Sequence, residues 1–415
     1  MTQWAPVWRV KINSIEYTDV ILATLTISSG RSNIYTQAQA GYCTVNLINL
    51  DQSAVLISIN DTLSVEVKDT SGVYVPIFGG NVSDVAITVS QVGSVAITQE
   101  ITITALGALA RLQKALTDGV LTQDFDGTQI ATILHDVLFA QWQSVPAALT
   151  WATYDPTITW ANAENNGYGE IDTPGNYELA ARASDRTVVY SLVSNLATSG
   201  LGYLYEDGQG LISYADSTHR TTYLATYGYT DLTANQALGR GIKIQSRAGD
   251  VRNDLTIKYG TLSGNEVSLK DDSSIALYGD LSQIITTTIK HQADAESQLA
   301  FYLSLRADPQ FNFDSITFAL TNPELDNGDR DSLLGVFMGQ PINLSDLPLN
   351  MSNGSFQGFV EGFRFQASYN ELSVTLLMSP LAYSLQAMAW ENVPVVEKWN
   401  TITPTLDWAN ATIVA

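Results

Sequence analysis

The sequence predicts a mainly β protein in which two related β-barrel domains flank an α+β insert. Three observations support this prediction. Apolar and polar residues alternate with a period of two from Trp8 to Gly107 and again after Gly241, as in half-buried strands. Between these regions the period becomes that of amphipathic helices. Finally, the stretches Ile77 to Gly107 and Phe359 to Pro380 share one pattern: a hydrophobe with small residues, a valine with an acidic residue, a polar turn and an alternating run.

The length of 415 residues indicates several domains, because single cores rarely grow beyond about 250–300 residues. We expect four segments. They are a first β-barrel over residues 1–112, an α+β middle domain over 113–240, a second β-barrel with one helix over 241–381, and an extended tail over 382–415.

The first domain consists of short runs rich in Val, Ile and Thr, such as VILATLTISSG and YCTVNLIN, separated by Gly, Asn and Asp. Regular strands with such punctuation are typical of a compact β-barrel or sandwich. Cys43 occupies an alternating position, which favours a small buried side chain over a nucleophile. As the only cysteine, it excludes an intrachain disulfide and a multi-cysteine metal site.

The middle domain begins with a predicted helix in FDGTQIATILHDVLFAQW, for which Asp126 or Thr128 could act as the N-cap. Its apolar face comprises Ile130, Ile133, Leu134, Val137 and Leu138. A second helix in SDRTVVYSLVSNLATSG ends at Gly200. The following LGYLYEDGQGLISYAD predicts a hairpin with its turn at Asp207 to Gly210.

The second β domain contains one predicted helix, ADAESQLAFYLSLRADP, which ends before Pro309. The alternating stretch from Phe359 to Pro380 closes this domain. Strand residues of both β domains are expected to act mainly through packing, and the candidates are Phe78, Val82, Phe359 and Phe363.

The tail contains a short segment that repeats an earlier segment of the chain. PTLDWANA, from Pro404, agrees at six of eight positions with PTITWANA, from Pro156. An extended segment with one indole can pair with an exposed strand edge while the ring fills a pocket, so Trp160 and Trp408 are candidate docking residues. Chance repetition of a common turn-and-strand phrase is the alternative.

The charge of the chain argues against nucleic-acid binding. Lys and Arg number 20 against 42 Asp and Glu, which gives a net charge of −22, whereas binding to phosphates requires clustered cations. Between Lys114 and Lys243 four arginines face fourteen carboxylates. Charged residues form only 15% of the chain, against about 25% in ordinary domains. This low fraction indicates either surfaces covered by partners or a secreted or fibrous β protein.

Catalytic and metal-binding motifs are absent from the sequence. His135, His219 and His291 lack metal-ligand spacing to one another or to cysteine, and there is no nucleophile elbow, zinc-protease motif or phosphate loop. The acidic run from Asp326 to Asp331 does not match a calcium loop and predicts an acidic turn. We therefore expect no cofactor, no bound metal and no enzymatic activity.

The ends and apolar runs give no targeting signal. The N-terminus has no secretory pattern, and no apolar run reaches the ~18 residues needed for a membrane-spanning segment. Synthesis and assembly in a cytoplasm are expected.

The opening stretch from Trp8 to Asn49 resembles the first domain of the central tail hub (baseplate hub) proteins of long-tailed bacteriophages. IFGGNVSDV is similar to the F-x-G-x-V strand of that family, and GFVEGFRFQ to its closing barrel strand. The hairpin near Asp207 and the helix before Pro309 follow in the same order. The resemblance runs to Pro380, and the tail past Ala382 lies outside it. The matching residues of the opening stretch are Ser28 to Arg31, Gln37, Gln39, Ala40, Gly41 and Asn49.

This resemblance implies a structural virion protein at the tail tip, assembled in the host cytoplasm. Hub proteins form homotrimers in which two barrels from each chain alternate in a pseudo-sixfold ring. The ring adapts a hexameric tail tube or distal tail protein to a trimeric spike or fibres. The tape measure protein is a further implied partner, and DNA passes through the ring without specific binding. The acidic middle domain would face this channel and repel DNA.

Two other functions remain open from the residues. A receptor-binding or adhesive tail protein could stack sugars on Trp142, Trp151 and Trp160. A tail-associated cell-wall hydrolase could use Asp124 and Asp126 as a carboxylate pair, although helix capping also explains these two residues.

Overall fold

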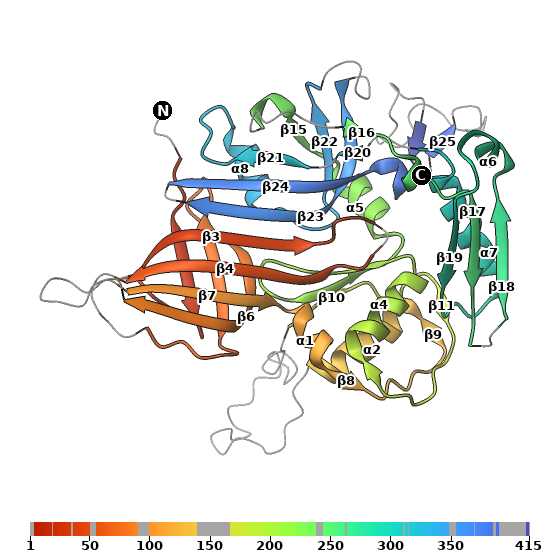
Figure 1. Ribbon diagram of the computed structural model, residues 1–415, viewed down its shortest axis with the longest axis horizontal. Coiled ribbons are helices and arrows are strands. Elements are labelled where there is room, and N and C mark those ends of the chain that lie inside the picture. Colours follow the sequence, from red (N-terminus) through yellow and green to blue (C-terminus); the bar gives the residue numbers. More distant parts are fainter. Residues whose placement is uncertain are drawn as a thin grey trace, which may run out of the picture.

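The computed structural model shows a strand-rich mixed α/β protein built around one large, mostly antiparallel sheet (Figure 1). The structure describes residues 4–18, 20–34, 36–49, 55–89, 99–138, 167–237, 244–261, 264–309, 312–313, 315–347, 354–368, 370–384, 387–389 and 412–414. Among these residues, no helix is long and apolar enough to cross a bilayer.

The first β region follows the predicted alternation closely. In β4 and β7 every second residue is buried from Gly41 and Ile101 onward, and Cys43 is completely inaccessible. Burial raises the pKa of the Cys43 thiol, so this side chain behaves as a small hydrophobe. The strands are β1 (Trp8–Ile12), β2 (Ile15–Glu16), β3 (Val20–Gly30), β4 (Gln39–Asn49), β5 (Thr62–Lys68), β6 (Tyr74–Val89) and β7 (Gln99–Gly107).

The middle region contains both predicted helices and the predicted hairpin. The apolar face of the first helix is buried, as its 3.6-residue spacing predicts, except that Val137 is only partly covered. The elements are α1 (Leu109–Lys114), β8 (Leu116–Thr117), β9 (Asp124–Phe125), α2 (Asp126–Leu138), β10 (Tyr168–Ile171), β11 (Glu178–Leu179), β12 (Thr187–Val188), α4 (Val189–Ser199), β13 (Tyr203–Glu206), β14 (Ile212–Ala215) and α5 (His219–Tyr227).

The last region combines long strands with a small subdomain, in which α7 packs on the sheet β18-β17-β19 (Figure 1). Its first elements are β15 (Thr230–Thr233), η2 (Ala234–Gln236), β16 (Ile244–Gln245), η3 (Ala248–Asp250), β17 (Asp254–Lys258), β18 (Glu266–Lys270), α6 (Asp272–Tyr278), β19 (Ser282–Thr286) and α7 (Gln292–Arg306). They are followed by β20 (Asn312–Phe313), β21 (Ile316–Ala319), α8 (Asn327–Leu334), β22 (Pro341–Ser345), β23 (Phe356–Ser368), β24 (Glu371–Pro380), η5 (Leu381–Tyr383), β25 (Ala387–Ala389) and β26 (Thr412–Val414).

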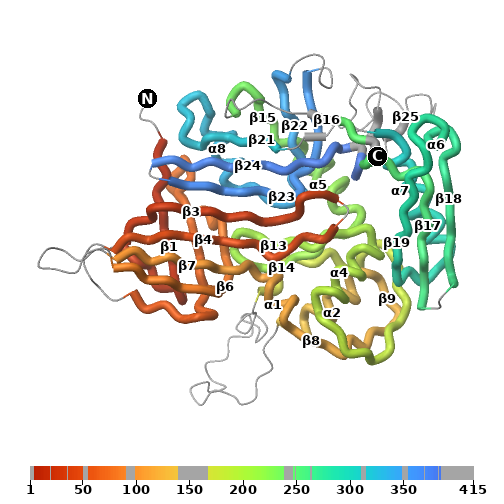
Figure 2. Tube along the Cα trace, in the orientation of Figure 1, coloured from red at the N-terminus to blue at the C-terminus, as the bar shows by residue number. Residues whose placement is uncertain are grey.

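The two β regions are joined in one sheet rather than forming separate barrels. The strand order is β15-β22-β23-β3-β4-β7-β6-β5-β1-β2. Two further strands lie off this path, since β24 pairs with β23 and β21 pairs with β24. Strand β3 of the first region pairs with β23 of the last, and the two lie side by side in Figure 2. This pairing provides hydrogen-bond partners for the backbone N–H and C=O groups along the edge of β3 and the facing part of β23. Among the described strands, the hydrogen-bonded path does not close into a barrel.

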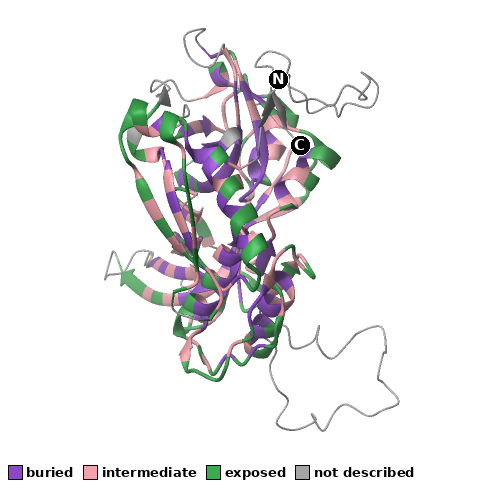
Figure 3. Cartoon of the chain, turned by 90° about the vertical axis from the view of Figure 1, so that its right-hand side faces the viewer, coloured by how far each residue is buried: buried purple, intermediate pink, exposed green. Residues whose placement is uncertain are grey.

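Two large cores follow from this arrangement. The first is shared by strands of both β regions and includes Ile27, Val45, Phe318 and Phe365. The second joins helices α2 and α4 to the small sheet under α7. Figure 3 shows buried residues running continuously through the interior of the chain. The apolar side chains that alternate in the sequence therefore meet across regions that lie far apart in the chain.

Candidate functional site

The two β regions contain the same four-stranded arrangement. Strands β5, β6, β7 and β4 are neighbours in this order, and β22, β23, β24 and β21 repeat it with the same antiparallel pairing. We call these the first and second repeat. They differ at one edge, because β1 runs antiparallel to β5 whereas β15 runs parallel to β22.

The registers show which residues correspond. Gly80 faces Gly107 in the first repeat, and Gly358 faces Pro380 in the second. Two residues later Val82 and Val360 occupy equal positions, and a bulge follows each of them. The shared motif is thus F-x-G-x-V, beginning at Phe78 and Phe356.

A close contact explains the glycine of this motif. A Cβ atom on Gly80 would lie 2.8 Å from the ring of Phe78, and one on Gly358 would lie 2.7 Å from the ring of Phe356. In both repeats the same Cβ would also overlap a carbonyl of the partner strand. The phenylalanine ring therefore lies over the glycine, and a side chain at the glycine position would displace the ring.

The candidate packing residues are all buried, but their correspondence differs from the sequence alignment. Phe78, Val82, Phe359 and Phe363 are at most 6% exposed. The sequence pattern compared the stretch that begins at Ile77 with the stretch that begins at Phe359, whereas the register makes Phe78 equivalent to Phe356. The pattern comparison began its second stretch inside the strand β23, after the phenylalanine and glycine of the shared motif.

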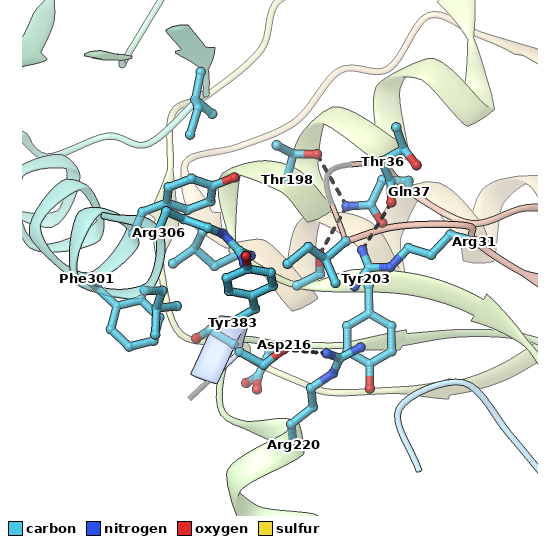
Figure 4. A pocket seen from close by; sticks show the side chains of 18 of the residues that line it. Arg31, Thr36, Gln37, Thr198, Tyr203, Asp216, Arg220, Phe301, Arg306 and Tyr383 are labelled. Carbon is cyan, nitrogen blue, oxygen red and sulfur yellow. Dashed lines mark hydrogen bonds between the residues drawn. The ribbon is translucent and has the colours of Figure 1, made fainter. Parts of the chain in front are cut away.

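The bulge residue of the second repeat, Glu361, forms a buried ionic junction. Its carboxylate accepts hydrogen bonds from Arg31 Nε at 2.7 Å and from Arg220 Nη1 and Nη2 at 2.8 and 3.0 Å. Ser379 Oγ donates a further hydrogen bond at 2.5 Å. Figure 4 shows the guanidinium groups of Arg31 and Arg220 near the ring of Tyr203.

The charge state of Glu361 follows from these partners. Burial alone would raise its pKa, but the two guanidinium charges and the hydrogen bonds lower the pKa to about 2. Arg31 directly follows β3 and Arg220 lies in α5, so one carboxylate links all three regions of the chain. The backbone is tied at the same point, since the Arg31 N–H donates to the Glu361 carbonyl at 2.8 Å.

A second buried carboxylate links the middle region to the first repeat. Glu206, at the end of β13, accepts hydrogen bonds from the backbone N–H groups of Gly41 and Leu109. Burial raises the pKa of Glu206 to about 7, and the backbone hydrogen bonds from Leu109 and Gly41 only partly oppose this shift. Folding therefore favours the protonated form near neutral pH.

The candidate catalytic pair does not have the environment of a sugar-cleaving pair. Asp126 is fully buried, and it accepts hydrogen bonds from the backbone of Asn176 and Tyr177 and from the hydroxyl of Tyr214. The Asp126 side chain, which the sequence offered as the cap of its own helix, therefore binds the backbone of the loop at Asn176 and Tyr177. Asp124 accepts a hydrogen bond from the adjacent Phe125 N–H.

Each of the three histidines contacts another side chain in the described part of the chain. His219 Nδ1 lies 2.8 Å from Asp172, His291 Nε2 lies 2.6 Å from Glu178, and His135 contacts the ring of Tyr168 edge-on. Within the described ranges, no three His, Cys, Asp or Glu side chains are grouped to hold a metal ion.

Two further expectations have different outcomes. The acidic run at Asp326 is not an isolated turn, because the Asp326 side chain caps α8 by accepting from the Asp329 N–H at 2.8 Å. Trp160 and Trp408, like Trp142 and Trp151, lie outside the described residues. The docking and sugar-stacking hypotheses for these tryptophans remain predictions.

Comparisons with solved structures show that this fold is similar to the folds of two tail proteins. The fold is similar to that of a tail protein from Neisseria meningitidis MC58, with a TM-score of 0.57 and 12% identity over 92% of this chain and 98% of that one. It is also similar to the 43 kDa tail protein of prophage MuSo2 from Shewanella oneidensis, with a TM-score of 0.53 and 10% identity over 90% and 98% of the two chains. No protein-family model and no curated protein sequence matches the chain. At these identities the similarity establishes the fold.

Proposed function

We propose that this chain is a structural component of a phage tail and acts as the central hub at the tail tip. Three copies form a ring in which first and second repeats alternate, so that six similar faces meet a hexameric tube or distal tail protein. The opposite side offers threefold symmetry to a spike or fibres. The tape measure protein is a further partner, and the role requires no catalysis.

The observation that carries this proposal is the unequal pairing of two equivalent strand edges. In the second repeat, Gly362 to Ala367 of β23 pair with β3. The equivalent segment of the first repeat, Asp84 to Val89 of β6, has β7 on one side and no partner on the other within the described strands.

This free segment has the properties of an edge that is covered on assembly. Ile87 is 55% exposed and Val89 is 46% exposed. Exposed apolar strand edges invite pairing with another chain. The internal β3–β23 pairing provides a template, and a neighbouring copy that covers β6 would continue the alternation around a closed ring.

The acidic middle region supports a conduit for DNA. A groove of about 1000 Å³ between β10, the β13–β14 hairpin and α5 is lined by Glu170, Asp172, Asp207 and Asp216. His219 is the basic residue among the described lining, and it is held by Asp172. Such a surface repels phosphates, so DNA would pass without specific binding.

Light scattering coupled to size-exclusion chromatography tests this proposal. The wild-type chain of 45.0 kDa is expected to elute as a trimer. Ile87→Lys places a charge on the free edge and should shift the protein toward the monomer. Ile284→Lys is the matched control, because Ile284 is 64% exposed on β19, outside both repeats. A wild-type monomer at every concentration, or equal effects of both variants, would contradict assembly through this edge.

A further inference from the structure

The acidic groove beside α5 also has an aromatic face. His219, Tyr223 and Tyr227 follow one another at intervals of four residues, so they lie on one side of the helix, and all three line the groove. The ring centroids of His219 and Tyr223 are 6.5 Å apart, and those of Tyr223 and Tyr227 are 4.6 Å apart. The ring of Phe337, which also lines the groove, lies 5.3 Å from that of Tyr223. We call these four residues the aromatic face.

The aromatic face is accessible from solvent and already ordered. Tyr227 is 72% exposed, and Tyr223 is half-buried. Aromatic side chains are enriched where one protein binds another, because they bury a large area with few rotatable bonds. Contacts between the rings restrict these side chains before a ligand arrives, which lowers the entropy lost on binding. The aromatic face therefore has the properties of a binding surface.

The other lining residues give the groove a negative charge. Glu170 is exposed on β10, and Asp172 follows that strand. Asp207 lies in the turn of the β13–β14 hairpin, and Asp216 follows β14. The described lining contains no Lys or Arg, and its one histidine, His219, lies 2.8 Å from Asp172. A concave site lined by one sign of charge concentrates the electrostatic field, so this groove attracts cations.

Other occupants fit these observations less well. A nucleic-acid strand is repelled by the carboxylates. A neutral glycan could stack on the tyrosine rings but would gain nothing from the charge of the groove. Residues 139–166, the segment of this chain that precedes β10, contain no Lys or Arg and supply no cation.

We propose that this groove binds a segment of a partner protein that carries lysine or arginine side chains. A cation is attracted to the face of a tyrosine ring, and the same cation can form ion pairs with nearby carboxylates. The volume of about 1000 Å³ lies at the upper end of the range for ligand pockets and exceeds the space that a single ion needs. This inference goes beyond the proposed function and does not depend on the number of copies in the assembly.

Fluorescence anisotropy of a labelled peptide of alternating lysine and glycine tests the site, with the full chain at about 0.15 M salt to screen weak binding elsewhere on the acidic surface. We expect saturable binding of one peptide per chain. Tyr227→Ala removes an exposed ring, Glu170→Gln removes an exposed charge, and each should weaken binding about threefold. The double variant should weaken it about tenfold. The matched control combines Tyr278→Ala and Glu371→Gln, which make the same changes at exposed residues outside the groove.

Each outcome decides for or against the inference. Peptide binding that the groove double variant weakens and the control double variant leaves unchanged supports it. If the peptide does not bind, or if both double variants weaken binding equally, the inference is wrong. A parallel titration uses a neutral oligosaccharide of N-acetylglucosamine. Binding of this sugar without binding of the peptide, weakened by Tyr227→Ala, would identify a glycan site and also overturn the inference. Because anisotropy measures peptide binding and not oligomeric state, these results are distinct from those that test the ring.

Discussion

Replacing Glu361 with glutamine should destabilise the whole chain. Glu361 is 1% exposed, and its carboxylate forms ion pairs with two buried guanidinium groups. The pKa of Glu361 is lowered from 4.5 to about 2, and each unit corresponds to about 1.4 kcal/mol, so the ionised form contributes roughly 3 kcal/mol. Removing one partner of a buried ionic pair costs about 3–5 kcal/mol, because the remaining charges stay buried without compensation. We expect a loss in this range for Glu361→Gln at pH 7.

Urea unfolding followed by circular dichroism measures this loss. Glu371→Gln is a suitable control, because Glu371 lies exposed at the start of the neighbouring strand β24. The pH dependence gives a second check. Since the pKa in the folded state is depressed, the contribution is complete above about pH 4.5 and is lost as the pH falls toward 2. The variant should lack this component. If Glu361→Gln and Glu371→Gln differ by less than about 1 kcal/mol, the junction does not carry the stability assigned to it.

Three further predictions concern the links between regions. Because burial raises the pKa of Glu206 to about 7, wild-type stability should decrease by roughly 3 kcal/mol as the pH rises from about 4.5 to 7, and thermal melts of Glu206→Gln should lack that decrease. Gly30→Ala should lower the melting temperature and cost more than ~1 kcal/mol, since Gly30 has φ of +89° and its Cβ would overlap the Glu361 carbonyl; an unchanged melting temperature would refute the close β3–β23 approach. Phe356→Ala and Phe78→Ala should each cost about 3–5 kcal/mol in urea unfolding, and a large difference between them would argue against equivalent roles in the two repeats.

The secondary structure of this chain could be predicted because it depends on local patterns. The alternation around Cys43 and the helical spacing of Ile130, Ile133 and Leu134 determine which face is buried, and the structure buries those faces. The turn at Asp207 follows from local chemistry in the same way, since its carboxylate accepts from the backbone of Gln209 and Leu211.

The junctions could not be predicted, because they depend on pairing over long sequence separations. Glu361 and Arg31 are 330 positions apart, and no local pattern in the sequence shows that their side chains meet. The same limit explains the misaligned repeat. The pairing register makes Phe356 the equivalent of Phe78, whereas the sequence comparison began its second stretch later in the same strand, at Phe359. A buried glutamate within an apolar strand, FVEGF, was the available signal for the junction.

The joining of two β regions in one sheet changes how the duplication should be understood. Two separate open sheets would leave their strand edges to be covered by partners, whereas the pairing of β3 with β23 covers the β3 edge inside the chain. The segment from Asp84 to Val89 is then the edge for which assembly matters most.

Cryo-electron microscopy of the assembled ring tests the central claim most directly. The account predicts three copies with six F-x-G-x-V hairpins around one axis, and β6 of each copy covered by the second repeat of its neighbour. A different number of copies, or β6 segments that face solvent in the assembled particle, would contradict it.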